Sequence, residues 1–352
     1  MSARHNDPMP ADLVDILERN RDDFEALRGC HIFVTGATGF VGSWLLESFL
    51  RAEDAFALGA RMSVLTRGPE VFARAAPHLA LHRAIEVLKG DVRDAGLVVG
   101  RFDAVIHAAT PASAKLNTEE PLTMMDTVVS GTRRVLEVAR RSGNIPFLFT
   151  SSGAVYGRQP PEMAVLREDY TGGPDPLDAR NAYHESKRLA ELQCAVYAAM
   201  NAVRPKIARL FAFVGPYLPI DRHFAVGNFV RDALAGRPIV IEGDGTPIRT
   251  YLYAADMTSW LWRILVLGRE NRPYNLGSEA PRSIAETADI VAQSVTPAVT
   301  VERRAEPTAG QLPERYACVT LRARQELQLD EWTSFEDAVQ RTIDWHRVRR
   351  AH

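Results

Sequence analysis

Cysteine is scarce in this 352-residue chain: the three that occur, Cys30, Cys194 and Cys318, lie far apart. An odd number of widely spaced cysteines favours a reducing compartment over a disulfide framework. Charge of one sign is also missing, because the formal net charge is only −2 at pH 7. There is therefore no electrostatic case for binding nucleic acid or an anionic membrane. The polar, charged N-terminus does not resemble a signal peptide, and we expect a cytoplasmic protein.

Long apolar runs are absent as well, since the stretch around Trp260 and Trp262 is interrupted by Arg263 and is too short to span a bilayer. His78 and His82 are spaced to share a helix face, but no third ligand lies near them in the sequence, so we expect no metal site. The hydrophobic content of 46% is enough for a sizeable core, and the length suggests two domains. These features indicate a soluble enzyme.

A glycine-rich turn follows the first predicted strand. Residues 31–35 are β-branched and aromatic, glycines stand at positions 36, 39 and 42, and an apolar helix is predicted from Phe40 to Leu50. A strand, a tight glycine turn and a helix N-terminus can form a pyrophosphate site, because the backbone approaches closely and free N–H groups point at the anion. The spacing G-x-x-G-x-x-G differs from the usual dinucleotide fingerprint. The residues predicted to contact a cofactor here are Gly36, Thr38, Gly39, Phe40, Val41 and Gly42.

The ends of the following predicted strands extend this cofactor site. Residues 62–67 end in Arg67 where an NAD-binding protein would carry an acidic residue, so NADP is slightly favoured over NAD. Asp91, followed by Val92, ends the strand at 87–92, where its carboxylate could accept from the adenine amino group. Residues 103–109 end in Ala108 and Ala109, which are small enough for a flat cofactor to lie against the backbone. His107 is predicted to be a packed or capping histidine.

The candidate chemistry lies in Tyr183 and Lys187, which are four residues apart on a helix predicted to begin near Asn181. The unperturbed phenol pKa of about 10 is too high for a base at neutral pH. A nearby ammonium and a positive nicotinamide ring would both favour the phenolate, so Tyr183 could exchange the substrate's hydroxyl proton while hydride moves. Ser152, at the end of the predicted strand 146–152, would hold the substrate oxygen. Strands alternating with helices predict an α/β fold with a parallel, doubly wound sheet.

With these segments the chain resembles an extended short-chain dehydrogenase/reductase of the NAD-dependent nucleotide-sugar epimerase/dehydratase family. The resemblance covers about residues 30–346 and implies a Rossmann-type domain, a smaller C-terminal substrate-binding domain, and a homodimer formed through helices near 119–141 and 181–201. Met124, Met125, Val135, Leu136 and Ala139 could supply that interface, although core packing explains them equally well. The motifs that carry the resemblance are Gly36–Gly42, Gly90–Asp94, His107–Ala109, Ser151–Gly157, Tyr183–Lys187, Arg209–Phe211, Gly215-Pro216, Gly243–Arg249 with Asp256, and Tyr274–Gly277.

The resemblance also implies a substrate side. Arg249 matches the arginine that contacts the diphosphate of a nucleotide sugar, Arg315 resembles a second phosphate-side arginine, and Asn228 resembles a residue that meets the diphosphate at a helix start. Arginine forks and helix N-termini do attract diphosphates. Each of the three could instead be an ordinary surface residue.

Three departures from the family pattern bear on the reaction. The family's dehydratases carry Asp-Glu after the serine or threonine position, and its decarboxylases carry a glutamate at the second of these positions. Gly153 and Ala154 stand there in this chain, and neither can exchange a proton. Val128 replaces the asparagine that is usual in the family. The leading hypothesis is therefore a 4-epimerase or 4-ketoreductase; the alternatives are a 4,6-dehydratase or decarboxylase, and a non-catalytic NAD(P)-binding protein.

The expected organisation has three parts. Residues 1–29 form an extension with an amphipathic helix at 12–27, residues 30–205 hold the cofactor, and residues 206–352 form mostly the substrate side, with about 254–270 returning to the cofactor domain. Residues 160–181 are predicted to be an irregular excursion that could act as a lid.

Overall fold

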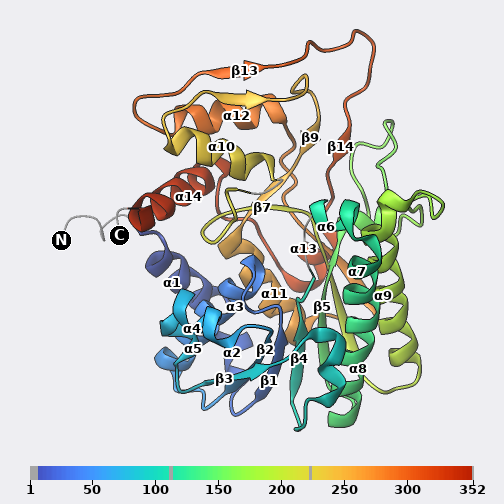
Figure 1. Ribbon diagram of the computed structural model, residues 1–352. Helices are drawn as coiled ribbons and strands as arrows, with labels where there is room; N and C mark the ends of the chain where they lie inside the picture. The colour runs from blue at the N-terminus through green and yellow to red at the C-terminus, as the bar shows by residue number, and fades with distance from the viewer. Residues whose placement is uncertain (1–6, 111–113, 222–223, 351–352) are drawn as a thin grey trace.

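A seven-stranded sheet forms the centre of the computed structural model, which describes residues 7–110, 114–221 and 224–350 (Figure 1). All of its neighbouring strands are parallel, in the order β11-β6-β5-β4-β1-β2-β3, which confirms the predicted doubly wound Rossmann-type fold. The order reverses between β1 and β4, and ligands of such sheets bind at the carboxyl ends of the strands at this point. The strands are β1 (His31–Thr35), β2 (Arg61–Thr66), β3 (Ile85–Lys89), β4 (Ala104–His107), β5 (Pro146–Ser152), β6 (Arg204–Leu210) and β11 (Arg272–Leu276).

The central strands β1, β4 and β5 are buried on both faces, which explains why they are largely apolar without alternation. In β1, Ile32 and Val34 join one core cluster, whereas Phe33 joins the other. Strand β5 divides in the same way, with Leu148 on one side and Phe147 on the other, because successive side chains point to opposite faces. The helices of this part are α3 (Phe40–Phe56), α4 (Pro69–Ala75), α5 (Pro77–Ala80), α6 (Ala114–Glu119), α7 (Pro121–Met125), the π-helix η3 (Asp126–Ser130), α8 (Gly131–Ser142) and α9 (Ala182–Ala199), and the short 3₁₀ segments are η2 (Val92–Leu97), η4 (Gly153–Tyr156) and η5 (Ala179–Asn181).

The N-terminal extension forms two helices, α1 (Met9–Arg19) and α2 (Arg21–Glu25), where the sequence predicted one. Ile16 and Phe24 are fully buried in the core cluster that contains the α3 side chains. Asp12 is also buried; it accepts a hydrogen bond from the Tyr253 hydroxyl at 2.6 Å and an ion pair from Arg341. The extension is therefore part of the body of the protein.

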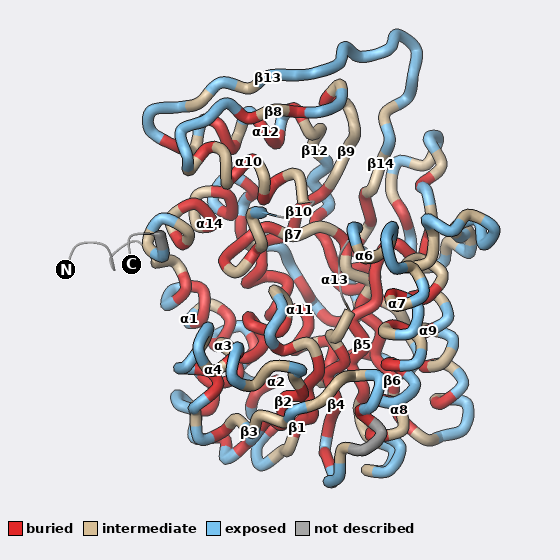
Figure 2. The backbone as a smooth tube through the Cα atoms, in the orientation of Figure 1, coloured by how far each residue is buried: buried red, intermediate tan, exposed pale blue. Residues whose placement is uncertain are grey.

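The smaller part of the molecule, in the upper half of Figure 1, is built from chain beyond β6. Its short strands form one three-stranded and two two-stranded sheets, and the tube in Figure 2 shows exposed backbone along its β13 edge. The elements are β7 (Ala212–Val214), α10 (Ala225–Leu234), β8 (Ile239–Ile241), β9 (Ile248–Arg249), β10 (Tyr251–Tyr253), β12 (Arg282–Ser283), α12 (Ile284–Gln293), β13 (Val301–Arg303), β14 (Arg315–Tyr316), α13 (Leu321–Leu327) and α14 (Phe335–Arg350).

Three segments of this later chain lie against the large sheet, and one of them is helix α13, which packs on β11 and α11. Helix α11 (Ala254–Leu267) packs on β5 and β6 and on helices α1, α2 and α3. Strand β11 pairs with β6 and so adds a seventh strand outside the range expected to return to the cofactor domain. The segment 160–178 carries no helix or extended strand, in line with the irregular excursion predicted there. Within the described ranges, no helix has the length and apolar character needed to cross a membrane.

Candidate active site

The glycine turn lies at the reversal point of the sheet, between β1 and α3. Gly36 has a φ of +76°, and a Cβ there would lie 2.4 Å from the carbonyl carbon of Ala108. A Cβ at Gly42 would lie 2.3 Å from the Gly36 carbonyl oxygen. Both positions therefore need glycine for the fold itself, since the backbones of the turn, α3 and the end of β4 touch.

Gly39 has no such internal requirement. Its φ is −91°, and a Cβ would meet only the Gly36 oxygen, at 3.4 Å, among the residues described. Gly39 and Thr38 are exposed, and α3 begins with no side-chain cap among the described residues. An uncapped helix N-terminus with an open, side-chain-free approach fits the pyrophosphate of a dinucleotide. Phe40 and Val41, the first residues of α3, are half-buried beside it.

The residues predicted to hold the nucleoside lie along the same edge. The pKa of Asp91, which follows the neighbouring strand β3, is lowered, and the charge of Arg67, exposed directly after β2, is a minor cause of this. The main cause of that lowered pKa is Arg93, whose guanidinium donates to Asp91 at 2.9 and 3.0 Å. Asp91 lies two residues beyond the end of β3 and caps η2, which starts at Val92. It therefore lies in the turn after the strand and not at the strand's last residue. Its carboxylate is already engaged by Arg93, which was not expected.

Ser152 and Tyr183 are brought together in the structure. Ser152 ends β5, Tyr183 is the second residue of α9, and the Ser152 hydroxyl interacts with the phenol of Tyr183. In the protein alone, burial raises the pKa of Tyr183 and this hydrogen bond lowers it. Ser152 also accepts a hydrogen bond from the Ala154 amide at 3.1 Å. Asn117 positions the start of α9, because its side-chain oxygen accepts from the Tyr183 amide at 2.9 Å.

Lys187 is buried one turn further along α9. Its ammonium donates to Thr110 Oγ1 at 2.8 Å and to the Thr150 carbonyl oxygen at 2.7 Å, and it lies 4.6 Å from the Phe149 ring centroid. Burial lowers the pKa of Lys187 to about 7. Two of the three donors of an ammonium are used within the protein. The lowering of the Tyr183 pKa by the Lys187 ammonium stays a prediction.

His107 is a packed histidine, as predicted. Its ring nitrogens hydrogen-bond Thr35 Oγ1 at 2.7 Å and Thr132 Oγ1 at 3.0 Å. Burial, and then the charge of Lys187, lower its pKa to about 3. The imidazole therefore stays neutral, and its two hydrogen bonds link Thr35 of β1 to Thr132 of α8.

The smaller part contributes Arg249 and a tyrosine that the sequence analysis did not assign to the site. In the sheet β12-β9-β14, Arg249 pairs in register with Tyr316, while Arg315 pairs with Ile248. Neighbouring residues of a strand point to opposite faces, so Tyr316, not Arg315, shares the face of Arg249. The Tyr316 hydroxyl interacts with Ser152. The only sequence signal for it was its place beside Arg315.

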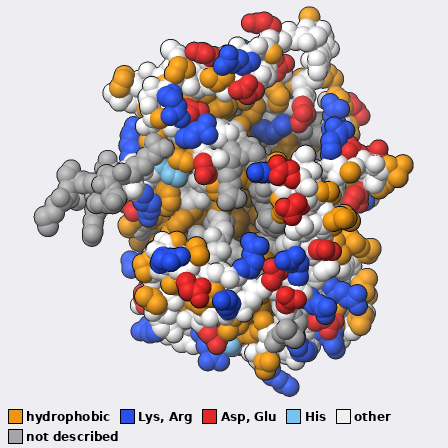
Figure 3. Space-filling view, viewed as in Figure 1, with side chains coloured by type: hydrophobic (Ala, Val, Ile, Leu, Met, Phe, Trp, Pro, Cys, Tyr) orange, Lys and Arg blue, Asp and Glu red, His pale blue; other side chains and the backbone are white. Residues whose placement is uncertain are grey.

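The Arg249 side chain is 25% exposed, and its guanidinium pairs with the exposed Glu314 at 2.7 Å. Asn228 lies in the first turn of α10, where its side chain accepts from Arg231 at 3.1 Å. A ligand phosphate would have to compete with these two partners. Figure 3 shows this face of the molecule hollowed between its two parts, with basic side chains at the margin.

The departures from the family pattern also have structural consequences. Gly153 and Ala154 are buried in η4, and Gly153 faces the rings of Tyr316 and Phe211. Val128 is fully buried inside the π-helix, in the same core cluster as Met124. Apolar packing therefore takes the place of the amide that is usual there.

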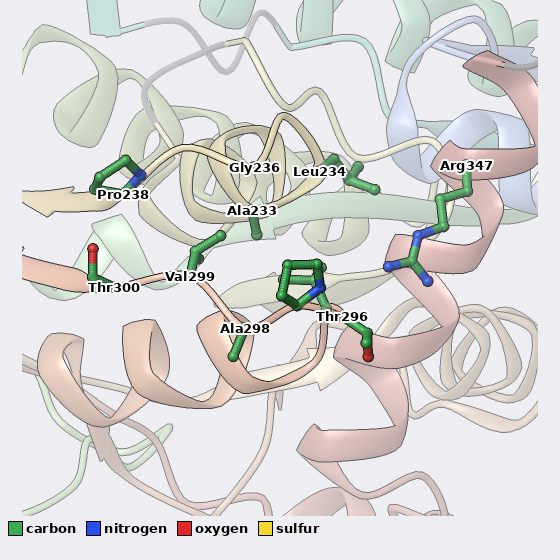
Figure 4. Close-up of a pocket in the computed structure, with 11 residues that line it drawn as sticks. Ala233, Leu234, Gly236, Pro238, Thr296, Ala298, Val299, Thr300 and Arg347 are labelled. Atoms are coloured by element: carbon green, nitrogen blue, oxygen red, sulfur yellow. The ribbon is translucent and has the colours of Figure 1, made fainter.

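Other candidate features lie apart from this site. A surface pocket of about 710 Å³ is lined by the end of α10, the loop after α12 and Arg347 of α14 (Figure 4), and it contains none of the predicted site residues. His78 pairs with Glu47 and His82 with Asp54. Over the ranges that the structure describes, no three potential ligands come together as a metal site.

The structure is a Rossmann-type α/β fold, with Ser152 at the end of a sheet strand and Tyr183 and Lys187 on the helix beside it. The sequence profile of the NAD dependent epimerase/dehydratase family matches residues 32–277, and the chain belongs to that family of enzymes. It is 30% identical over 298 residues to UDP-glucuronic acid decarboxylase 6 of Arabidopsis thaliana, covering 84% of this chain and 81% of the relative. It is 28% identical over 321 residues to UDP-glucuronic acid decarboxylase 1 of Xenopus tropicalis, covering 91% and 73%.

Solved structures share the fold at lower identity. An epimerase of Methanothermobacter thermautotrophicus superposes with a TM-score of 0.80 at 23% identity, covering 95% of this chain and 98% of that one. A UDP-glucuronic acid 4-epimerase of Bacillus cereus, solved with UDP-glucuronic acid and NAD, gives a TM-score of 0.74 at 20% identity, covering 92% and 100%.

Proposed function

We propose that this protein transfers hydride between a bound nicotinamide cofactor and a carbinol carbon of a nucleotide sugar, and that it works as a 4-epimerase or a 4-ketoreductase. The observation that carries the proposal is the meeting of Ser152 and Tyr183 above Lys187, at the edge of the sheet where the glycine turn offers an anion site. A non-catalytic binding protein would not need this set.

Each side chain has a defined task in the proposed reaction. The bound cofactor supplies a hydride acceptor and a positive ring. Tyr183 takes the hydroxyl proton, and Ser152 holds the oxygen that loses it. Because burial raises the phenol's pKa in the protein alone, the phenolate depends on the Ser152 hydrogen bond and on charge brought by the cofactor. Lys187 has one donor left over for a cofactor hydroxyl.

The contacts proposed for the cofactor follow the strand ends. The pyrophosphate would meet the amides from Gly36 to Gly42, and Ala108 and Ala109 would flank the dinucleotide. We propose NADP ahead of NAD, because the exposed Arg67 stands where a carboxylate would bind the ribose of NAD. The family description names NAD, so NAD is the competing assignment.

The diphosphate of the substrate is assigned to the smaller part. Arg249, Asn228 and Arg315 remain our candidates, with Arg249 the best placed because it shares the face of Tyr316. An arginine fork can exchange a surface carboxylate such as Glu314 for a diphosphate, which offers two charges.

The choice of reaction depends on the residues after Ser152. Gly153 has no side chain and Ala154 only a methyl group, so neither can expel water or assist loss of a carboxylate. This favours epimerisation or reduction of a keto-sugar. Decarboxylation of a nucleotide uronic acid is the second candidate, because the relatives at 28–30% identity are UDP-glucuronic acid decarboxylases.

We also propose a homodimer. Of the residues named for the interface, Met124, Val135, Leu136 and Ala139 are core residues in the structure, and Met125 is 39% exposed. Besides Met125, the exposed large apolar side chains on α9 and its neighbour α7 are Leu189, Leu192, Val196 and Leu122. Their spacing on α9 puts three of them on one helix face.

The three free cysteines remain our reason for proposing a cytoplasmic protein.

A substrate panel tests the proposal. In one arm the purified protein is incubated with NAD or NADP and, separately, with UDP-glucose, UDP-glucuronic acid and dTDP-glucose; in a second arm it receives NADH or NADPH and a 4-keto nucleotide sugar. The products are separated and identified by nuclear magnetic resonance. We expect a C4 epimer or a reduced product, and a loss of about 10²–10⁴ in turnover for Tyr183→Phe. A decarboxylated or 4-keto-6-deoxy product would replace the leading assignment, and no reaction with any nucleotide sugar would overturn it.

A further inference from the structure

Tyr316 occupies the space that a side chain at position 153 would need. A Cβ on Gly153 would lie 2.6 Å from the Tyr316 hydroxyl oxygen and 2.8 Å from Cζ of Phe211, both closer than real Cβ contacts. The two rings pack at a centroid distance of 4.7 Å. The absence of a side chain at Gly153 therefore leaves room for the phenol of Tyr316, which comes from the smaller part of the molecule.

The backbone on both sides of Tyr316 is fixed by hydrogen bonds. Strand β14 pairs with β9, and the Ala317 amide donates to Gln159 Oε1 at 3.0 Å. The Ala317 carbonyl oxygen accepts from the Leu166 amide at 2.8 Å. Two segments distant in sequence thus hold the phenol in one place, which is what a positioning group needs.

The hydrogen bonds around Ser152 explain what the phenol can do there. A serine hydroxyl has two acceptor lone pairs and one proton to donate. The Ala154 amide uses one lone pair, at 3.1 Å, and both Tyr316 and Tyr183 interact with the same hydroxyl. If Tyr316 donates to the second lone pair, the single Ser152 proton is left for Tyr183 or for the substrate oxygen. Burial raises the pKa of Tyr316, so it keeps its proton and remains a donor.

We propose that Tyr316 is a positioning residue that orients the Ser152 hydroxyl as a donor toward Tyr183 and the substrate, and that Gly153 is required to admit it. The effect on turnover rests on the proposed function, but the orientation of Ser152 does not. In this arrangement the position after Ser152 cannot hold a carboxylate while Tyr316 keeps its place.

A titration without substrate tests the orientation directly. Ultraviolet difference spectroscopy of the NAD⁺-saturated protein, with Tyr183→Phe subtracted, follows ionisation of the Tyr183 phenol. Tyr316→Phe should raise that pKa by roughly half a unit to one unit, the worth of one hydrogen bond. Tyr170→Phe is the matched control, because Tyr170 packs against the same cluster through Tyr156 and should leave the titration unchanged. An unchanged pKa in Tyr316→Phe would overturn the proposal.

Gly153→Ala tests the pairing. It should raise the Tyr183 pKa in the wild-type background and have a smaller effect in Tyr316→Phe, because the hydroxyl that it displaces is gone. Equal effects in both backgrounds would show that the two positions are independent. Thermal melts of all variants identify any loss of folding. If Gly153→Ala does not fold, the titration of Tyr316→Phe alone tests the proposal.

Turnover supplies the second measurement. With a nucleotide sugar that the wild type oxidises, Tyr316→Phe should lower kcat by about three- to tenfold with little change in KM, and should move the rise of the pH–rate profile upward. A loss confined to KM would assign Tyr316 to substrate binding and overturn the positioning role. If the wild type neither oxidises nor reduces any nucleotide sugar, the proposed function fails, while the titration still decides the role of Tyr316.

Discussion

Replacing two glycines of the same turn should have opposite consequences, because only one of them is required by the protein itself. Gly36→Ala would place a Cβ 2.4 Å from the backbone of Ala108, at a φ of +76°. A left-handed conformation costs a non-glycine residue about 1–2 kcal/mol, and the overpacking adds about 1–3 kcal/mol. The free energy of unfolding should therefore fall by about 2–5 kcal/mol.

Gly39→Ala should leave the fold almost unchanged. The nearest atom to the new Cβ is the Gly36 oxygen at 3.4 Å, and the φ of −91° suits any residue. The free energy of unfolding should stay within about 0.5 kcal/mol of wild type, as for most substitutions away from the core. The methyl group would instead stand in the approach to the uncapped N-terminus of α3, so the affinity for the cofactor should fall.

Two assays separate these effects. Urea denaturation gives the free energy of unfolding, and titration of NADH and NADPH fluorescence gives the affinity. We expect Gly36→Ala to be destabilised, and Gly39→Ala to unfold like wild type but bind both cofactors at least tenfold more weakly. Wild-type affinity in Gly39→Ala would refute the placement of the pyrophosphate, and wild-type stability in Gly36→Ala would refute the packing argument.

Three further predictions concern charges. Arg67→Ala should reduce the affinity for NADPH by about tenfold and leave that for NADH unchanged, as fluorescence titration would show; equal affinities in the wild type would contradict it. Arg249→Ala should weaken binding of UDP about ten- to a hundredfold in calorimetry without altering cofactor affinity, unless Arg249 serves only Glu314. Burial raises the pKa of Asp256 to about 7 from 3.8, so the stability that its proton provides is present at low pH and lost as pH rises through 7. Asp256→Asn keeps the acceptor for the Trp332 amide and should remove this pH dependence in urea denaturation between pH 4 and 8, where an unchanged slope would contradict it.

Local patterns were enough to predict the cofactor half. The strands at 31–35 and 146–152 have the predicted bounds, because buried parallel strands are short apolar runs that end at a turn or a hydroxyl. The spacing of Tyr183 and Lys187 places both on one helix, which is a property of the helix alone. Ser152 lies at the same edge of the sheet as the glycine turn because the strands are parallel, and the carboxyl ends of parallel strands meet at one edge.

Other features depend on contacts between distant segments. The pKa of Tyr183 is raised because the phenol is buried. The Lys187 ammonium donates hydrogen bonds to Thr110 and Thr150, which come from other parts of the chain. Met124 and Leu136 have the pattern of an interface and of a core equally, and the structure places them in the core. Single-sequence patterns cannot distinguish these cases, because both bury the same apolar groups.

The sequence by itself determined the glycine turn, the serine-ended strand and the Tyr183–Lys187 helix, since each depends on residues within one turn or strand. Only the tertiary structure decided that Tyr316 reaches Ser152 and that Gly153 gives it room. These residues lie 163 positions apart, at 153 and 316, and meet because β14 pairs with β9 above the carboxyl edge of the sheet. No local pattern encodes that pairing, because a two-residue strand is defined only by its partner.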